Sequence, residues 1–213
     1  MTYLLSWTGW LATDGGYDRQ PAGEGLPGAL GALWEYHAAM YRFHVGLSTP
    51  HAYESPAWQW PLLIRPTSMY WHEDAGTVQA ISSIPNPLIW WGGIVATGYL
   101  VYRFVRRRDR DSAFVLTGVA ATFVPWLLYP ERTTFQFYTV VMLPFLVLAA
   151  ALALRDLAGA PTAAPDRRIG GVRTVLVLLA LAVVLSAFWY PVWTALPVPY
   201  DFWRLHNWLP TWV

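Results

Sequence analysis

The 213-residue chain is 55% hydrophobic and 13% charged, against roughly 25% charged residues in an ordinary soluble domain. Its 14 tryptophans are a large excess, and tryptophan concentrates at membrane–water interfaces, so the composition indicates a membrane protein. The chain has no cysteine, which excludes disulfides, thiolate metal sites and cysteine nucleophiles. The net charge of +1 gives no signal for nucleic acid, and we expect no such partner.

The N-terminal part begins with an apolar segment, residues 1–10, which is shorter than the about 20 residues that a spanning helix needs. The segment is typical of the last turns of a helix whose beginning is missing, and no positively charged signal-peptide region precedes it. We therefore expect a fragment, or a start codon inside a longer gene. Residues 12–25 are polar and glycine-rich, which predicts a loop. Residues 26–47 repeat apolar and aromatic side chains at helical spacing, which predicts an amphipathic helix at the membrane surface or in a groove between helices.

Residues 51–71 combine many aromatic rings with regularly spaced prolines. Pro56, Pro61 and Pro66 recur every five residues, so no long helix can run through this stretch. Tyrosines and tryptophans surround Arg65, which directly precedes Pro66. The stretch is too aromatic for a solvated loop and too broken for a span. We expect it to lie at a membrane–water interface, where aromatic rings and arginine are both stable.

The rest of the chain is dominated by four apolar segments of nearly spanning length. A weakly alternating, β-branched stretch, residues 77–84, comes first and suggests a short strand. In a bilayer an open chain can satisfy its backbone only as a helix, so each apolar segment predicts a transmembrane helix. Pro125 and Pro144 lie inside two segments and predict kinks. The predicted transmembrane helices are residues 87–105, 113–129, 135–154 and 172–193.

The distribution of arginine predicts the orientation of these helices. Arginines cluster in the connections after the first and third segments, which places both connections in the cytoplasm. The leader (residues 1–85), the link between the second and third segments and the aromatic tail (residues 194–213) then face outward across the plasma membrane. The fold class is therefore an all-α polytopic membrane protein with an extracytoplasmic amphipathic helix and aromatic segment. The clustered arginines are Arg103, Arg106, Arg107, Arg108, Arg110, Arg155, Arg167, Arg168 and Arg173.

Two outward-facing arginines are candidates for phosphate chemistry. Glu131 and Arg132 lie in a tight link that holds them at the membrane surface, where a lipid phosphate would lie, so Arg132 could bind or neutralise that phosphate. A local Glu131–Arg132 pair or an ordinary headgroup contact would explain the same residues. Arg65 could also meet a phosphate, or it could pair with an acid such as Glu54.

Two histidine-containing patterns invite a metal interpretation, and neither is favoured. His37, His44 and His51 recur every seven residues, but Pro50 breaks the register and no acid completes the set, so packed interfacial histidines are favoured. Residues 71–74, with the sequence WHED, could hold a divalent ion, although a solvated turn is the favoured interpretation. We expect no metal site, and the residues do not decide whether a divalent cation takes part in the chemistry.

Several motifs together resemble one known family. The order SWTGW, DGGYDR, HAYESPAWQWPLLIRP, NPLIWW and YPERTTFQFY is similar to the C-terminal membrane region of protein O-mannosyltransferases, especially the actinobacterial members. The resemblance implies a polytopic glycosyltransferase of the GT-C type. It implies transfer of mannose from a polyprenyl-phosphate donor to serine or threonine of secreted proteins, with inversion at the sugar carbon.

The same resemblance implies roles for a few residues. Arg132 is expected on the donor-phosphate side, and Arg65 is expected in donor binding and in shaping the outer cavity. The family's catalytic acid lies in a loop near the N-terminus of the full-length protein, so we expect the base outside this chain and give that role to neither Asp14 nor Asp18. The rival interpretation is a non-catalytic membrane subunit that docks a partner at its outer face. The other residues expected to shape the cavity are His51, Tyr53, Glu131 and Tyr138.

Overall fold

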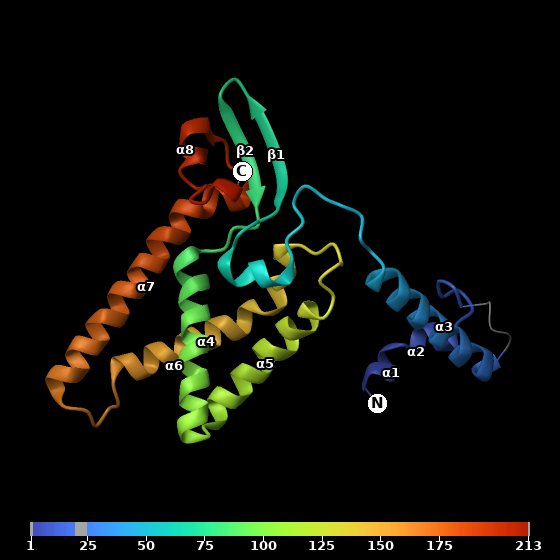
Figure 1. Ribbon diagram of the computed structural model, residues 1–213, viewed down its shortest axis with the longest axis horizontal. Coiled ribbons are helices and arrows are strands. Elements are labelled where there is room, and N and C mark those ends of the chain that lie inside the picture. Colours follow the sequence, from blue (N-terminus) through green and yellow to red (C-terminus); the bar gives the residue numbers. More distant parts are fainter. Residues whose placement is uncertain (1, 20–24, 213) are drawn as a thin grey trace. The chain divides into compact units, whose positions relative to one another are not determined.

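The computed structural model describes residues 2–19 and 25–212. These residues form two compact units, residues 1–48 and residues 49–213. The first unit holds three of the helices, and the second holds the remaining helices and a small sheet (Figure 1). The chain is mainly helical, as the sequence predicts.

The N-terminal unit is built around one long helix, which confirms that the segment predicted over residues 26–47 is helical. Two short helices precede the long one. Trp7 lies between the short helices, and its ring packs edge-on against His37 of the long helix, with ring centroids 5.1 Å apart. The Tyr3 hydroxyl contacts Nε2 of His37, and Nδ1 of His37 lies 2.7 Å from the Leu33 carbonyl oxygen. His37 is therefore a packed histidine. The three helices are α1 (Thr2–Ser6), α2 (Thr8–Ala12) and α3 (Gly25–Val45).

The second unit contains one helix for each of the four predicted apolar segments. Among the described residues, α4 and α7 are both long and apolar enough to cross a membrane. Their exposed side chains include Val95 on α4 and Val183 on α7, at 73% and 69% exposure, as expected for surfaces that face lipid. The four helices are α4 (Pro87–Arg107), α5 (Arg110–Leu127), α6 (Leu143–Ala158) and α7 (Pro165–Thr194).

The third predicted segment, residues 135–154, is not one continuous helix. Residues Gln136–Val141 form a 3-10 helix, η2, and α6 begins only at Leu143. Pro144 occupies the first turn of α6, where its missing N–H costs nothing. Pro144 therefore opens a helix, and the predicted kink there is wrong, whereas Pro125 does lie inside α5.

A three-stranded antiparallel sheet is added to the helices, in the order β1–β2–β3. Strand β2 confirms the predicted strand, and residues 71–74 belong to β1 rather than to a turn. The turn follows at Ala75 and Gly76, which have φ of 46° and 79°, as a tight hairpin turn requires. The tail supplies the third strand and then α8 and η3. The elements are β1 (Ser68–Asp74), β2 (Thr77–Ser82), β3 (Val198–Pro199), α8 (Tyr200–Arg204) and η3 (Pro210–Trp212).

Close packing joins α4 to α6, and a polar clamp joins α4 to α7. A Cβ at Gly93 of α4 would lie 2.9 Å from Cβ of Leu146 on α6, so the glycine is what lets these helices touch. Asn86 caps α4 by accepting from the N–H groups of Leu88 and Ile89. Its amide also donates to the Ala182 carbonyl of α7 at 2.8 Å, which fixes α7 against the start of α4.

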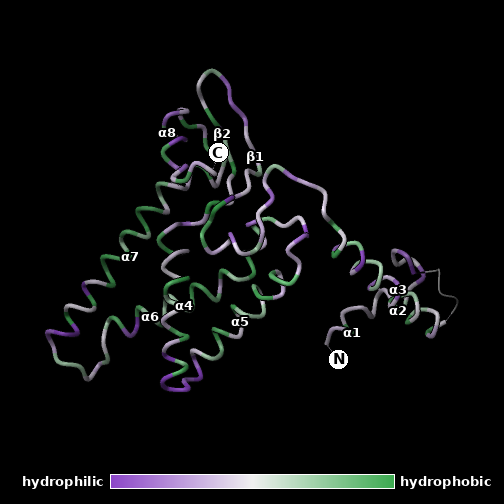
Figure 2. Tube along the Cα trace, viewed as in Figure 1, coloured by the Kyte–Doolittle hydropathy of each residue, from purple (hydrophilic) through white to green (hydrophobic). Residues whose placement is uncertain are grey.

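The helices have two chemically different ends. The α4–α5 and α6–α7 connections, which carry the clustered arginines, lie at the end of the helices remote from the sheet (Figure 1). Figure 2 shows the helix ends at these connections as hydrophilic and much of the helix length between them and the sheet as hydrophobic. We call the end of the helices remote from the sheet the arginine-rich end, and the opposite end, next to the sheet, the sheet end.

Candidate functional site

The predicted site residues gather at the sheet end around the segment before β1. The 3-10 helix η1 (Ala57–Leu62) follows Ser55, whose N–H donates to the Thr134 carbonyl at 2.8 Å. The Thr134 hydroxyl returns a hydrogen bond to the Ser55 carbonyl, also at 2.8 Å. This reciprocal pair holds residues 49–67 against the link that carries Glu131 and Arg132.

Arg65 lies between Tyr53 and the C-terminal tail. Its guanidinium carbon is 5.2 Å from the centre of the Tyr53 ring. Its Nε–H and Nη2–H donate to the Ala52 carbonyl, and its Nη1–H donates to the Thr211 carbonyl at 3.0 Å. Glu54 accepts a hydrogen bond from the backbone N–H of His51. Arg65 therefore joins the aromatic segment to the tail through backbone carbonyls.

Arg132 is held in a similar way by two rings. Its guanidinium carbon lies 5.1 Å from the Trp126 ring centre and 5.7 Å from the Tyr138 ring centre. Arg132 is half-buried. A guanidinium over aromatic rings contacts them through its flat face, and its N–H groups lie in the guanidinium plane, the fork geometry that suits an oxyanion in general.

One chain of ring contacts joins the two arginines. His51 packs edge-on against Phe135 at 5.0 Å, and Phe135 packs against Tyr138 at 5.9 Å. Tyr53 lies 6.1 Å from His51, and its N–H donates to His51 Nδ1. The predicted site residues other than Glu131, which is exposed, thus form one contiguous group. We call it the arginine–aromatic cluster: His51, Tyr53, Arg65, Trp126, Arg132, Phe135 and Tyr138.

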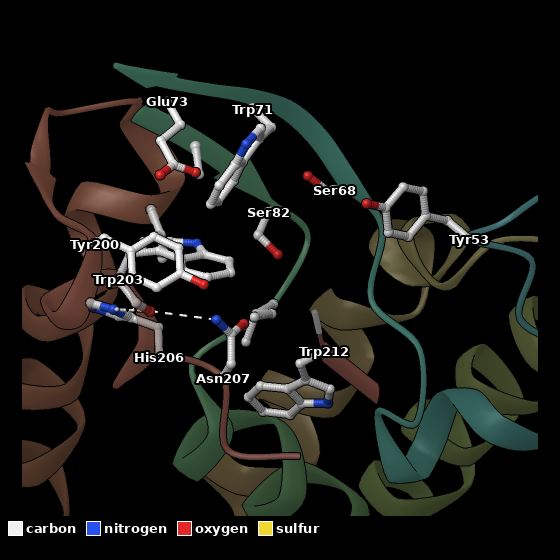
Figure 3. A pocket seen from close by; sticks show the side chains of 13 residues that line it. Tyr53, Ser68, Trp71, Glu73, Ser82, Tyr200, Trp203, His206, Asn207 and Trp212 are labelled. Atoms are coloured by element: carbon white, nitrogen blue, oxygen red, sulfur yellow. Dashed lines mark hydrogen bonds between the residues drawn. The ribbon is translucent and has the colours of Figure 1, made fainter. Parts of the chain in front are cut away.

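A cavity of about 300 Å³ lies beside this cluster, between the hairpin and the tail (Figure 3). Tyr53 is the one residue shared by the arginine–aromatic cluster and the described lining of the cavity. The cavity is not among the sites predicted from the sequence, although the alternation of Trp71 and Glu73 on one strand is a usable signal. The facing wall comes from Val192 and the C-terminal tail, more than 100 residues further along the chain, and no local pattern exists for such a contact. The cavity is lined by Tyr53, Ser68, Trp71, Glu73, Ala80, Ser82, Ile84, Val192, Tyr200, Trp203, His206, Asn207 and Trp212.

At the arginine-rich end, the buried side chain of Arg103 is the centre of an ion network. Arg103 donates to Asp109 and to Asp156, each at 2.9 Å, and the Tyr99 hydroxyl donates to Asp156 at 2.7 Å. The side chain and backbone N–H of Ser112, followed by the Arg103 guanidinium, lower the pKa of the Asp109 carboxyl below its ordinary 3.8. The network joins α4, α5 and α6, so its function is structural.

The structure brings no metal-binding group together within residues 2–19 and 25–212. The ring of His44 packs on Phe43 at 5.3 Å, and that of His51 packs on Phe135. The side chains of residues 71–74 extend along β1 and alternate between its two faces.

Long apolar helices with arginine-rich connections at one end and an aromatic, arginine-bearing site at the other define a helical membrane protein. The chain belongs to the protein O-mannosyltransferase family, because the family model for the C-terminal four TMM region of protein-O-mannosyltransferase matches residues 29–212.

Curated relatives and a solved structure agree with this assignment. The chain is 35% identical, over 99% of its length, to a polyprenol-phosphate-mannose–protein mannosyltransferase of Mycolicibacterium smegmatis, and 34% identical to one of Mycobacterium tuberculosis. It spans 44% of the length of each. Its fold matches a chain of the donor-bound Saccharomyces cerevisiae Pmt1–Pmt2 complex with a TM-score of 0.74 at 22% identity, covering 86% of this chain and 27% of that one.

Proposed function

We propose that this chain is the C-terminal part of a membrane enzyme that transfers mannose from polyprenyl-phosphate mannose to serine or threonine of secreted proteins. The observation that carries the proposal is the 35% identity, over 99% of the chain, to a polyprenol-phosphate-mannose–protein mannosyltransferase. The arginine–aromatic cluster is the part of the chain suited to the donor.

Arg132 is the residue that we assign to the donor phosphate. As the mannosyl bond breaks, negative charge grows on the leaving phosphate, and a fixed cation lowers the energy of that transition state. The rings of Trp126 and Tyr138 hold the guanidinium in place before the donor arrives. A preorganised cation loses little side-chain entropy on binding, which favours Arg over a flexible lysine here.

The other cluster residues shape the outer cavity of the proposed site. Arg65 fixes Tyr53 beneath the tail, and its charge adds to the local positive potential that attracts an anionic lipid headgroup. His51 and Tyr138 form the aromatic wall between the two arginines. Glu131 is exposed beside Arg132 and limits how much positive charge the link presents.

The proposed orientation in the plasma membrane follows from the two ends. The arginine-rich end would lie in the cytoplasm by the positive-inside rule. The cluster, the leader and the C-terminal tail would then face the extracytoplasmic side, where secreted acceptors pass. Membrane lipids would contact the exposed apolar side chains of α4 and α7.

The catalytic base is proposed to lie in the part of the relatives that this chain does not span. Transfer to a hydroxyl needs a carboxylate within hydrogen-bond reach of the acceptor. Asp14 and Asp18 belong to the N-terminal unit and are given no such role.

A membrane transfer assay tests the proposal. Membranes containing this chain alone, or this chain joined to the N-terminal half of a mycobacterial relative, are given polyprenyl-phosphate mannose and a threonine-rich peptide. We expect mannosylated peptide only from the joined form. Transfer by the chain alone would place a base within it, with Asp14 and Asp18 the first residues to substitute. No transfer in either form would contradict the proposal and favour a docking subunit.

A further inference from the structure

The cavity beside the arginine–aromatic cluster has the wall chemistry of a sugar site. A pyranose has an apolar C–H face and a rim of hydroxyls, so it suits a pocket with aromatic walls and a few convergent polar groups. Trp71 and Trp203 meet edge to face with ring centroids 4.4 Å apart, and Tyr200 lies 5.5 Å from Trp203. In Figure 3 these rings form one side of the cavity, with Trp212 below.

The polar groups of the cavity are placed by the hairpin and the tail. Trp71 and Glu73 share one face of β1, and the Glu73 carboxylate points from the hairpin toward the tail rings of Trp203 and Tyr200 (Figure 3). The register shifts between Ser68 and Tyr70, which adds one residue to β1. This bulge is what turns Ser68 onto the same face as Trp71, opposite its partner Ser82 on β2.

These polar groups are available to a ligand. Within residues 2–19 and 25–212, the side chains of Glu73, Ser82 and Tyr200 make no hydrogen bond to another protein group. Asn207 reaches the Trp203 carbonyl only at 3.5 Å, the outer limit of a hydrogen bond. The cavity therefore presents a carboxylate, hydroxyls and an amide to whatever enters it.

Hydrogen bonds and ring contacts within the protein fix the frame around the cavity. The Trp212 N–H donates to the Leu63 carbonyl at 2.6 Å. His206 is buried with its ring stacked on Phe188 at 4.2 Å, and its Nε2 lies 2.7 Å from the Phe188 carbonyl oxygen. A preformed pocket loses little entropy on binding. Its volume of about 300 Å³ lies at the lower end of small-molecule sites, which suits one or two sugar rings.

We propose that this cavity binds a hexopyranose, with the C–H face against Trp71 and Tyr200 and the hydroxyls on Glu73 and Ser82. That the sugar is mannose rests on the proposed function. The mannose could be attached either to the lipid donor or to an acceptor that has already been modified. Binding of a modified acceptor would keep a threonine-rich chain at the enzyme through successive transfers.

The direct test measures methyl α-D-mannopyranoside binding to the purified 213-residue chain by saturation-transfer NMR. We expect saturable binding, with a Kd raised about tenfold by Glu73→Gln and by Tyr200→Ala, the loss that follows removal of a charged hydrogen bond or a stacking ring. Asp74→Asn is the matched control, because Asp74 is the next residue on β1 and does not line the cavity. Absence of binding, or an unchanged Kd in both folded variants, overturns the proposal.

Two further arms separate folding from binding and one sugar source from the other. Tyr200→Phe keeps the ring and removes only the hydroxyl, so it replaces Tyr200→Ala if circular dichroism shows unfolding. The same substitutions are made in the joined enzyme and compared with the parent. If they raise the KM only for a mannosylated peptide, the site belongs to the acceptor; if they raise the KM for the donor, it belongs to the lipid-linked mannose. Sugar binding without any transfer activity would retain the cavity site and reject the proposed function.

Discussion

The two ends of the helices use arginine in opposite ways. Arg103, at the arginine-rich end, is 7% exposed and is held by two carboxylates at 2.9 Å. Arg65 and Arg132, at the sheet end, lie over aromatic rings. In a buried ion pair the carboxylates neutralise the positive charge of the arginine. A guanidinium over aromatic rings retains a positive electrostatic potential that can attract an anionic ligand. The first end is a structural joint and the second is suited to binding.

The largest expected effect is loss of stability on breaking the ion network. Arg103→Ala removes the buried cation and its hydrogen bond to the half-buried Asp156, and we expect unfolding to become easier by about 2–3 kcal/mol. Denaturation by SDS in mixed micelles measures this change. Arg106→Ala is the control, since Arg106 is exposed on the same helix and should change stability by less than about 0.5 kcal/mol. Equal effects of the two substitutions would refute the structural assignment of Arg103.

The sheet end should respond in activity instead. Arg132→Ala in the joined enzyme should lower kcat/KM for transfer by about 100-fold, because one fixed group that stabilises a developing oxyanion contributes about that much. Arg132→Lys should recover only part of the loss, since lysine cannot stack as a planar fork on Trp126 and Tyr138. SDS denaturation of each variant controls for folding. Full activity of Arg132→Ala would remove Arg132 from the donor site.

Arg65 should show a smaller, local effect. Arg65→Ala removes the hydrogen bonds to the Ala52 and Thr211 carbonyls and the contact with Tyr53. We expect the tail to open more easily by about 1–2 kcal/mol. Hydrogen exchange of residues 205–212 measures this opening. Arg204→Ala, at an exposed arginine of the tail itself, should leave the exchange unchanged, and unaltered exchange in Arg65→Ala would show that the tail is held by other contacts.

The smallest expected effect is a pH dependence at the arginine-rich end. Because the pKa of folded Asp109 lies below its ordinary 3.8, its contribution to stability is complete above pH 3.8 and is lost as the pH falls through the folded value. The Tm difference between the parent and Asp109→Asn should therefore be constant from pH 7 to about pH 5 and should shrink below about pH 4. A difference that instead shrank between pH 7 and pH 5 would exclude Asp109 as its source.

The sequence predicted the helices better than the ends of those helices. Apolar runs and the Asn86–Pro87 start locate α4, because capping and hydrophobic length act locally. The prediction was wrong at Pro144, since the same residue opens a helix or kinks one depending on whether the preceding residues stay helical. The strand predicted over 77–84 is confirmed as β2, but its partner β1 was not predicted, because the polar sequence of residues 71–74 favoured a solvated turn.

The sequence by itself determined that the chain is helical and membrane-bound in character and which family it belongs to, and it singled out Arg65 and Arg132 as candidate site residues. These properties follow from composition, periodicity and short motifs. Only the tertiary structure decided that one chain of rings joins the two arginines, that Arg103 is buried between two carboxylates, and that the tail closes a cavity over β1. Each of these depends on contacts between residues distant in the sequence, and such contacts leave no local pattern.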